Sequence, residues 1–140
     1  MTIQERLRNY WGHRHFREGQ QEAIEAVLEG RPVLVLFPTG GGKSICYQLP
    51  ATMLDGLTVV ISPLVSLMQD QVDELNRIGI HATFINSTLP GHEVEQRLIN
   101  ARNGMYRLLY LSPERLATPL WQQLAPDLKI SLIAVDEAHC

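Results

Sequence analysis

Short apolar runs alternate with amphipathic stretches along the chain. Five runs are apolar on both faces and rich in β-branched residues, as strands covered on both sides of a sheet should be. They lie at 32–37, 57–62, 81–86, 107–112 and 131–136. After the second run, apolar residues from Leu64 to Ile78 recur at the three-to-four spacing of a helix. Alternation of strands and helices predicts an α/β fold, with a parallel sheet joined by right-handed crossovers.

Two helices are expected before the first strand. Thr2 and Glu5 have the spacing of a capping box, which marks the start of a helix. A second helix is expected over about residues 18–29, because Gly30 follows it and glycine is common just after a helix C-terminus.

Size and composition limit the class of protein. The chain has 140 residues and a net charge of −3. That length suits one domain, which we expect to comprise N-terminal helices over 1–30 and a partial sheet-based lobe over 31–140. No run approaches the roughly 18 apolar residues of a membrane span. The N-terminus lacks a secretory stretch, and Cys46 and Cys140 form no metal-type pair. A cytoplasmic location is expected, at the nucleoid in a bacterium, and the negative charge weighs mildly against nucleic-acid binding.

A glycine run at 40–42, followed by Lys43 and Ser44, stands between a strand and a helix. Glycines allow the backbone N–H groups to turn toward an anion. Lys43 can reach the β and γ phosphates of a nucleotide, and the Ser44 hydroxyl can ligate magnesium. The strict phosphate-loop pattern has a further glycine where this chain has Phe37. The alternative is a glycine turn with an exposed lysine, which explains neither the strand before it nor the helix after it.

Two carboxylates, Asp136 and Glu137, follow the last apolar run. The first stands where a nucleotide's magnesium ion is held, and the second can deprotonate an attacking water. This pattern favours hydrolysis over transfer to a small acceptor. Taken alone, the pair is better explained as the cap of a helix N-terminus; the phosphate loop upstream favours the metal role.

Ser-Pro turns follow two of the apolar runs, at Ser62-Pro63 and Ser112-Pro113. Serine can cap a helix and proline suits its first position. In a parallel sheet both helix N-termini would emerge at the carboxyl edge, where ligands bind. Two such ends can hold nucleic-acid phosphates, with Arg115 adding charge. Ordinary helix caps remain the alternative.

The ordered set of motifs resembles the first RecA-like lobe of RecQ-family DNA helicases, in superfamily 2, over essentially the whole chain. The N-terminal signature comprises Leu7, Trp11-Gly12, Phe16-Arg17, Gln20 and Ile24, with Trp11 where the family has phenylalanine. The other matching segments are FPTGGGKSICYQLPA, SPLVSLMQDQVDEL, NST at 86–88, LLYLSPERL and AVDEAHC. The resemblance implies a P-loop RecA-like parallel sheet with flanking helices, incomplete here at about five strands.

The resemblance also implies ATP and Mg²⁺ as cofactors, and single-stranded and duplex DNA as partners. Gln20 would read the adenine, Arg17 would stack on it, and His139 would couple the ATP site to the DNA track. His13 stands where relatives often have a tyrosine. The implied catalytic residues are Lys43, Asp136, Glu137 and His139, with Ser44 and Asp136 at the metal. The implied nucleotide-binding residues are His13, Arg17, Gln20, Thr39, Gly40, Gly41, Gly42, Lys43 and Ser44. The implied DNA-binding residues are Ser62, Pro63, Leu64, Ser112, Pro113, Glu114 and Arg115.

In the resembled family, an aromatic-rich loop and a second RecA-like lobe with arginine fingers follow this segment. We therefore expect ATP-dependent 3′-to-5′ helicase activity in a longer protein, and negligible hydrolysis by these residues alone. We also expect unpaired edges on the strands at 32–37 and 131–136. A small-molecule P-loop kinase is disfavoured by the N-terminal signature, whereas a non-catalytic nucleotide- or DNA-binding module stays open.

Overall fold

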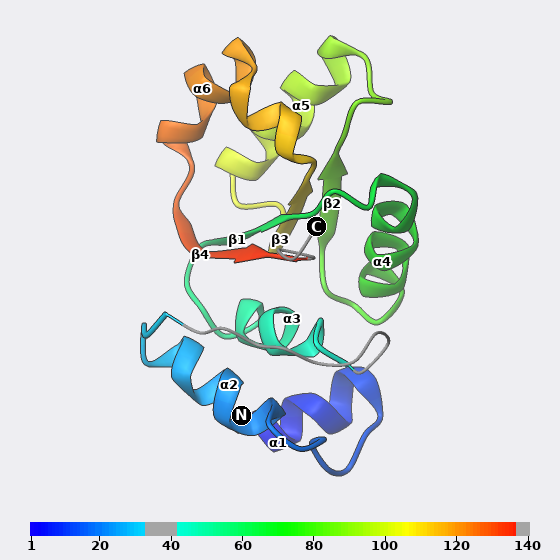
Figure 1. Ribbon diagram of the computed structural model, residues 1–140, viewed down its shortest axis with the longest axis vertical. Helices are drawn as coiled ribbons and strands as arrows, with labels where there is room; N and C mark the ends of the chain where they lie inside the picture. The colour runs from blue at the N-terminus through cyan, green and yellow to red at the C-terminus, as the bar shows by residue number, and fades with distance from the viewer. Residues whose placement is uncertain (33–41, 137–140) are drawn as a thin grey trace. The chain divides into compact units, whose positions relative to one another are not determined.

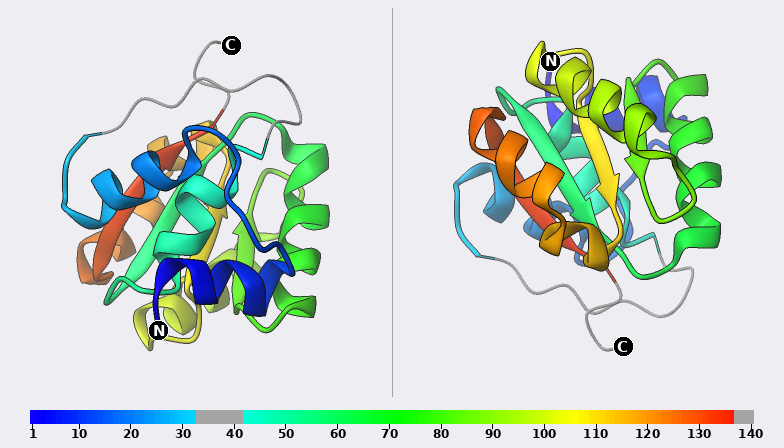
Figure 2. Two further views of the ribbon diagram at one scale, coloured as in Figure 1. Left: turned by 90° about the horizontal axis from the view of Figure 1, so that it is seen from below. Right: turned by 90° about the horizontal axis from the view of Figure 1, so that it is seen from above.

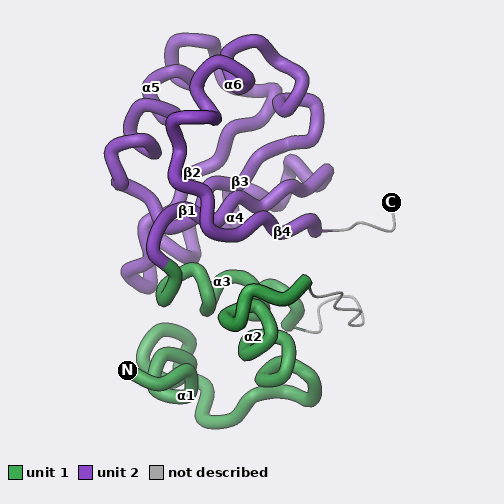
Figure 3. Tube along the Cα trace, turned by 90° about the vertical axis from the view of Figure 1, so that its left-hand side faces the viewer, with its two compact units in different colours: residues 1–54 green, residues 55–140 purple. Residues whose placement is uncertain are grey.

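The computed structural model describes residues 1–32 and 42–136 (Figure 1). It contains two compact units, Met1–Leu54 and Asp55–Cys140, which Figure 3 colours separately. The strand expected at 32–37 lies almost wholly outside the described residues. The expected single domain, with its helical part ending at residue 30, stays a prediction.

The first unit is helical in its described residues. It contains α1 (Ile3–Arg6), a π-helical turn η1 (Leu7–Trp11), α2 (Gln20–Leu28) and α3 (Ile45–Ala51). The Thr2 hydroxyl accepts a hydrogen bond from the Glu5 amide at 3.1 Å, which confirms the capping prediction. Gly30 follows α2 at a φ of 80°, as expected for the residue after a helix end. The core of this unit consists of Leu7, Ile24, Ile45 and Leu49.

The second unit contains a four-stranded parallel sheet in the order β2-β3-β1-β4. Its strands are β1 (Leu57–Ile61), β2 (Ala82–Ile85), β3 (Leu108–Leu111) and β4 (Ile130–Val135). These are the last four of the five expected strands, so the α/β class and the parallel pairing are confirmed. Within the described sheet, β2 and β4 are the edge strands.

Helices connect the parallel strands. They are α4 (Val65–Arg77), α5 (Gly91–Arg102), η2 (Pro113–Ala117), α6 (Pro119–Leu124) and η3 (Ala125–Asp127). The right-hand view of Figure 2 shows α5 and α6 on the same face of the strands. There, Val94 and Leu98 of α5 share a buried cluster with β-strand residues such as Leu109.

The expected helix after β1 forms as α4, and its apolar pattern is only partly buried. Met68, Val72 and Leu75 are buried, whereas Leu67 is 46% exposed. Leu64 lies just before the helix rather than within it.

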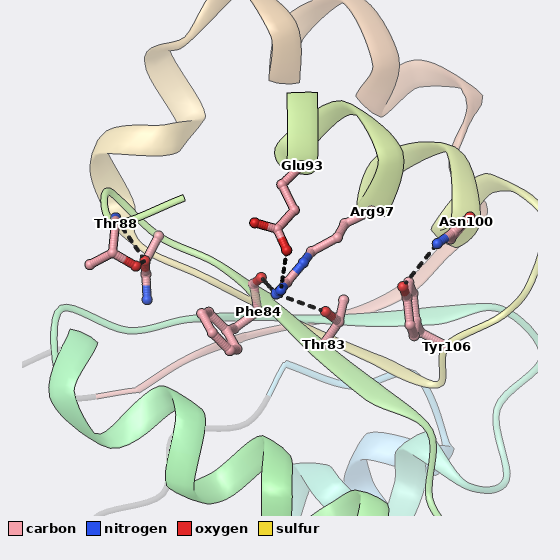
Figure 4. Close-up of polar contacts among 8 residues, drawn as sticks. Thr83, Phe84, Thr88, Glu93, Arg97, Asn100 and Tyr106 are labelled. Carbon is pink, nitrogen blue, oxygen red and sulfur yellow. Dashed lines mark hydrogen bonds and ion pairs between the residues drawn. The ribbon is translucent and has the colours of Figure 1, made fainter. Parts of the chain in front are cut away.

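Side chains form hydrogen bonds with backbone groups on the outer edge of β2. Carbonyl groups of His81 and Ile85 accept bonds from β3 or the residues beside it, so the groups of the alternate residues face away from β3. The Arg97 guanidinium donates to the Phe84 carbonyl at 2.6 Å and lies over the Phe84 ring (Figure 4). Asn76 of α4 bonds both the amide and the carbonyl of Ala82 at 3.0 Å. These contacts occupy backbone groups that would otherwise template another strand.

Leucine-to-alanine substitution at two helical positions tests this packing. Leu98→Ala is expected to lower the free energy of unfolding by about 2–5 kcal/mol, because Leu98 is 1% exposed and its loss leaves a cavity. Leu67→Ala is the matched control and should change that energy by less than about 0.5 kcal/mol. Chemical denaturation measures both, and equal destabilisation would contradict the assigned core.

Candidate functional site

Gln20 joins the N-terminal signature to the end of the glycine loop. Its side-chain oxygen accepts a hydrogen bond from the Arg17 amide at 2.7 Å. Its side-chain nitrogen donates to the Gly42 carbonyl at 2.9 Å. The side chain is 3% exposed, so both bonds satisfy a polar group that would be costly to bury alone. The structure therefore brings together three of the residues expected at one nucleotide site.

A side chain at Gly42 would be strained and would displace the Gln20 amide. Its φ is 82°, in the left-handed region, and an added Cβ would lie 2.7 Å from the Gln20 side-chain nitrogen. Lys43 and Ser44 follow at the start of α3, where the Ser44 carbonyl accepts from the Gln48 amide at 2.9 Å. Thr39, Gly40 and Gly41 lie outside the described residues, while His13 and Arg17 are exposed.

In the second unit, the expected site residues lie at the carboxyl ends of the strands. Ser62 follows β1, Ser112 follows β3 and Asp136 follows β4. Backbone hydrogen bonds continue the pairing past the strand ends: the Asp136 amide donates to the Ile61 carbonyl at 2.8 Å. The location at one sheet edge is thus as expected for parallel strands. Glu137 and His139 lie outside the described residues.

The predicted cap at Ser62 is wrong. Helix α4 begins at Val65 with Leu64 at the N-cap, so Pro63 is not its first residue. The Ser62 hydroxyl accepts from the Leu64 amide at 3.2 Å, a local turn that competes with helix formation. Ser62 is also 5% exposed, which leaves little of its side chain for a ligand.

At the second Ser-Pro turn, the serine and the proline have the predicted positions, but the predicted hydrogen bond of the serine hydroxyl does not form. Ser112 is the N-cap of η2 and Pro113 is its first residue, but the Ser112 hydroxyl makes no capping bond. It is fully buried and has no hydrogen-bond partner among the described residues. The expectation that this hydroxyl caps a helix is therefore wrong; the turn itself forms because proline suits the first position.

Arg115 makes a contact that local patterns did not reveal. Its guanidinium donates to the backbone carbonyls of Asn86 and Leu89, beyond the end of the neighbouring strand β2. The pairing of β2 with β3 brings these segments together. In the sequence, the one indication of this contact was that the NST and SPER motifs each directly follow a predicted strand.

A cavity in the second unit lies at the amino ends of the strands. It has a volume of about 560 Å³, and its lining includes Asp55, Arg102, Arg107 and Lys129. Lys129 donates to Asp55 at 2.5 Å and thereby lowers the pKa of that carboxyl. None of the residues expected at the site lines this cavity.

None of the helices in the described part of the chain has both the length and the apolar character needed to cross a bilayer. Among the described residues, no three His, Cys, Asp or Glu side chains gather as a metal-binding group.

Comparison with known proteins gives the family. The DEAD/DEAH box helicase model matches residues 17–140. The chain therefore belongs to the DEAD/DEAH box helicase family. The DNA-bound crystal structure of the DUF1998 helicase MrfA matches with a TM-score of 0.72 at 21% identity, covering 90% of this chain and 19% of that one. This likeness shows a shared fold.

Within the family, the resemblance to RecQ helicases is confirmed. The chain is 50% identical over 135 residues to the ATP-dependent DNA helicase RecQ of Bacillus subtilis (strain 168). It is 48% identical over 134 residues to the RecQ helicase of Haemophilus influenzae, and 48% over 141 residues to that of Synechocystis sp.. These matches cover 96%, 96% and 99% of this chain. The chain spans 23%, 22% and 30% of those relatives.

Cys46, two residues after Ser44, gives a test of the packing behind the loop. Its thiol is buried in α3, and burial raises its pKa to about 11 from 9.0. In a Cys140→Ser background at pH 8, alkylation of Cys46 by iodoacetamide should be roughly 100-fold slower in the folded than in the unfolded chain, since two pKa units separate the thiolate fractions. Because the folded pKa is the higher one, stability should fall as pH rises from 9.0 toward about 11. Equal alkylation rates in the two states would contradict the buried thiol.

Proposed function

We propose that this chain is the ATP-binding and strand-contacting part of a RecQ-type DNA helicase. In the whole protein, ATP hydrolysis would drive 3′-to-5′ movement along DNA and its unwinding. The single observation that carries the proposal is the pair of hydrogen bonds through which Gln20 connects Arg17 with Gly42. It links an adenine-reading signature to a phosphate loop.

The Gln20 amide suits adenine recognition. An amide can bond adenine through two contacts, donating to N7 and accepting from the N6 amino group. The bonds to Arg17 and Gly42 use one of two amide hydrogens and one of two oxygen lone pairs. Because Gln20 is 3% exposed, reading the base would require its amide to become accessible when ATP binds, with Arg17 stacking on the ring and His13 beside it.

The phosphates of ATP would lie on the loop that contains Thr39, the three glycines, Lys43 and Ser44. The Ser44 hydroxyl and the Asp136 carboxylate are hard oxygen donors, the ligand type that magnesium prefers. Bound Mg²⁺ supplies charge neutralisation at the β and γ phosphates. Glu137 would deprotonate the attacking water, and His139 would couple this site to the DNA track. An arginine from a second lobe would complete the transition-state charge in the whole protein.

Single-stranded DNA would pass the carboxyl edge of the sheet in the second unit. Segments 62–64 and 112–115 lie there, and Pro63, Leu64, Pro113 and Glu114 are the exposed members. Because Ser62 and Ser112 are buried, contacts from these turns would come chiefly from backbone groups. Duplex DNA would be engaged by the longer protein, in the cytoplasm and at the nucleoid of a bacterium.

Substitution of Gln20 tests the proposed nucleotide site. Gln20→Ala is expected to remove most of the preference for ATP over GTP, because the paired contacts to adenine are lost. Lys43→Ala should weaken both nucleotides about 10- to 100-fold, since a hydrogen bond to a charged group is worth about 1.5–3 kcal/mol. Calorimetry of the chain with each nucleotide and Mg²⁺ measures these effects.

The control variant is Gln21→Ala, which removes an exposed amide from the same helix. The Gln21 side chain bonds Glu25 at 2.8 Å rather than the loop. It should leave both affinities unchanged. If Gln20→Ala behaves like Gln21→Ala, the adenine-reading role is wrong; if Lys43→Ala binds ATP as tightly as the unsubstituted chain, the phosphate site is wrong.

A further inference from the structure

The NST motif at 86–88 has no role in the function proposed above, yet it forms an ordered loop. Asn86 directly follows β2 and is 3% exposed. Its side-chain oxygen accepts from the Thr88 amide at 2.9 Å and from the Thr88 hydroxyl at 2.5 Å. Thr88 is labelled in Figure 4. The loop thus closes on a buried asparagine and leaves Ser87 and Thr88 exposed.

A second contact holds the loop from outside. Arg115 of η2 donates to the Asn86 carbonyl through Nε at 3.1 Å and through a terminal nitrogen at 2.7 Å. The same terminal nitrogen donates to the Leu89 carbonyl at 3.2 Å. Asn86 and Leu89 are the first and last residues of the loop, so one guanidinium spans both of its ends.

Strand pairing fixes the position of this guanidinium. Strands β2 and β3 are adjacent and parallel, and the Ser112 amide continues the pairing by donating to the Ile85 carbonyl at 3.2 Å. Arg115 follows three residues later and is half-buried. A planar guanidinium with donors at fixed angles can bridge two carbonyls, whereas the single ammonium of a lysine acts as a point charge.

We propose that Arg115 is a positioning residue for the DNA track: it holds the 86–89 loop, whose Thr88 donors are bonded to Asn86, so that exposed Ser87 presents its hydroxyl and amide donors to the phosphates of a single strand. Such neutral donors commonly fix a nucleic-acid backbone. The inference rests on the proposed function, since it concerns the same carboxyl edge of the sheet. It replaces the direct phosphate contact expected for Arg115 with an indirect role.

The two roles differ in their salt dependence. A cation that contacts a phosphate of a single strand contributes about 0.7 to the slope of log K against log salt concentration. A residue that acts only by holding a loop contributes affinity without contributing to that slope. Replacement of Arg115 by lysine also distinguishes direct phosphate contact from loop positioning, because lysine keeps the charge but cannot bridge the two carbonyls in the same way.

The test measures binding of the 140-residue chain to a fluorescein-labelled oligothymidylate of about 16 nucleotides. Fluorescence anisotropy is recorded between about 50 and 200 mM salt. Arg115→Gln and Arg115→Lys are each expected to weaken binding roughly tenfold with an unchanged salt slope, as for the loss of bonds to a charged donor. Arg102→Gln removes the same charge from the exposed C-terminal end of α5 and should change neither quantity.

Amide hydrogen exchange of the same variants reports on the loop directly. Thr88 and Leu89, whose amides donate to Asn86, should lose protection in both Arg115 variants, while β3 keeps its protection. Arg115→Lys supplies the measurement if Arg115→Gln fails to fold. Unchanged protection, unchanged affinity, or a slope that falls by about 0.7 would each overturn the positioning role. If the unsubstituted chain binds no oligothymidylate, the proposed DNA function fails, and loss of loop protection would still support the clamp itself.

Discussion

The central constraint in this molecule is the parallel pairing of β1 with β3 on one side and β4 on the other. It brings the carboxyl ends of strands that are distant in sequence to a single edge. Backbone hydrogen bonds extend the pairing past the strands, from the Ser62 amide to the Leu111 carbonyl at 3.1 Å and from the Asp136 amide to the Ile61 carbonyl at 2.8 Å. Ser62 and Asp136 are therefore placed by backbone hydrogen bonds, while buried side chains such as Leu109 hold the sheet to its helices.

A single buried amide has the corresponding role in the first unit. Gln20 is 3% exposed, and its two hydrogen bonds connect the Arg17 amide with the carbonyl of Gly42, whose φ of 82° favours glycine. Because a buried amide without partners is costly, the arrangement favours one geometry of the Gly42 region. In both units, then, a polar contact between segments distant in sequence sets the position of a loop: Gln20 at Gly42, and Arg115 at Asn86.

Features that depend on neighbouring residues were predictable from the sequence. The doubly apolar runs identified β1 to β4, because strands covered on both faces have that composition. In β4 only one face is covered by the described residues, since Ile133 and Val135 are 58% and 60% exposed. The spacing of Thr2 and Glu5 identified the first helix, since its cap is a contact within one turn. Features decided by local competition or by distant pairing were not. The Ser62 hydroxyl bonds Leu64 and delays α4, whereas periodicity alone placed the helix start earlier. The clamp between Arg115 and Asn86 depends on the order of strands in the sheet, which no local pattern contains.

The proposed binding of one nucleotide and its metal ion by the glycine loop and Asp136 is tested most directly by amide NMR. The isotopically labelled chain is titrated with a non-hydrolysable ATP analogue and Mg²⁺. If the proposal is right, the amides of Gln20, Lys43 and Asp136 shift together and fit one dissociation constant. Shifts at Gln20 and Lys43 with an unperturbed Asp136, in the presence of saturating Mg²⁺, would contradict it.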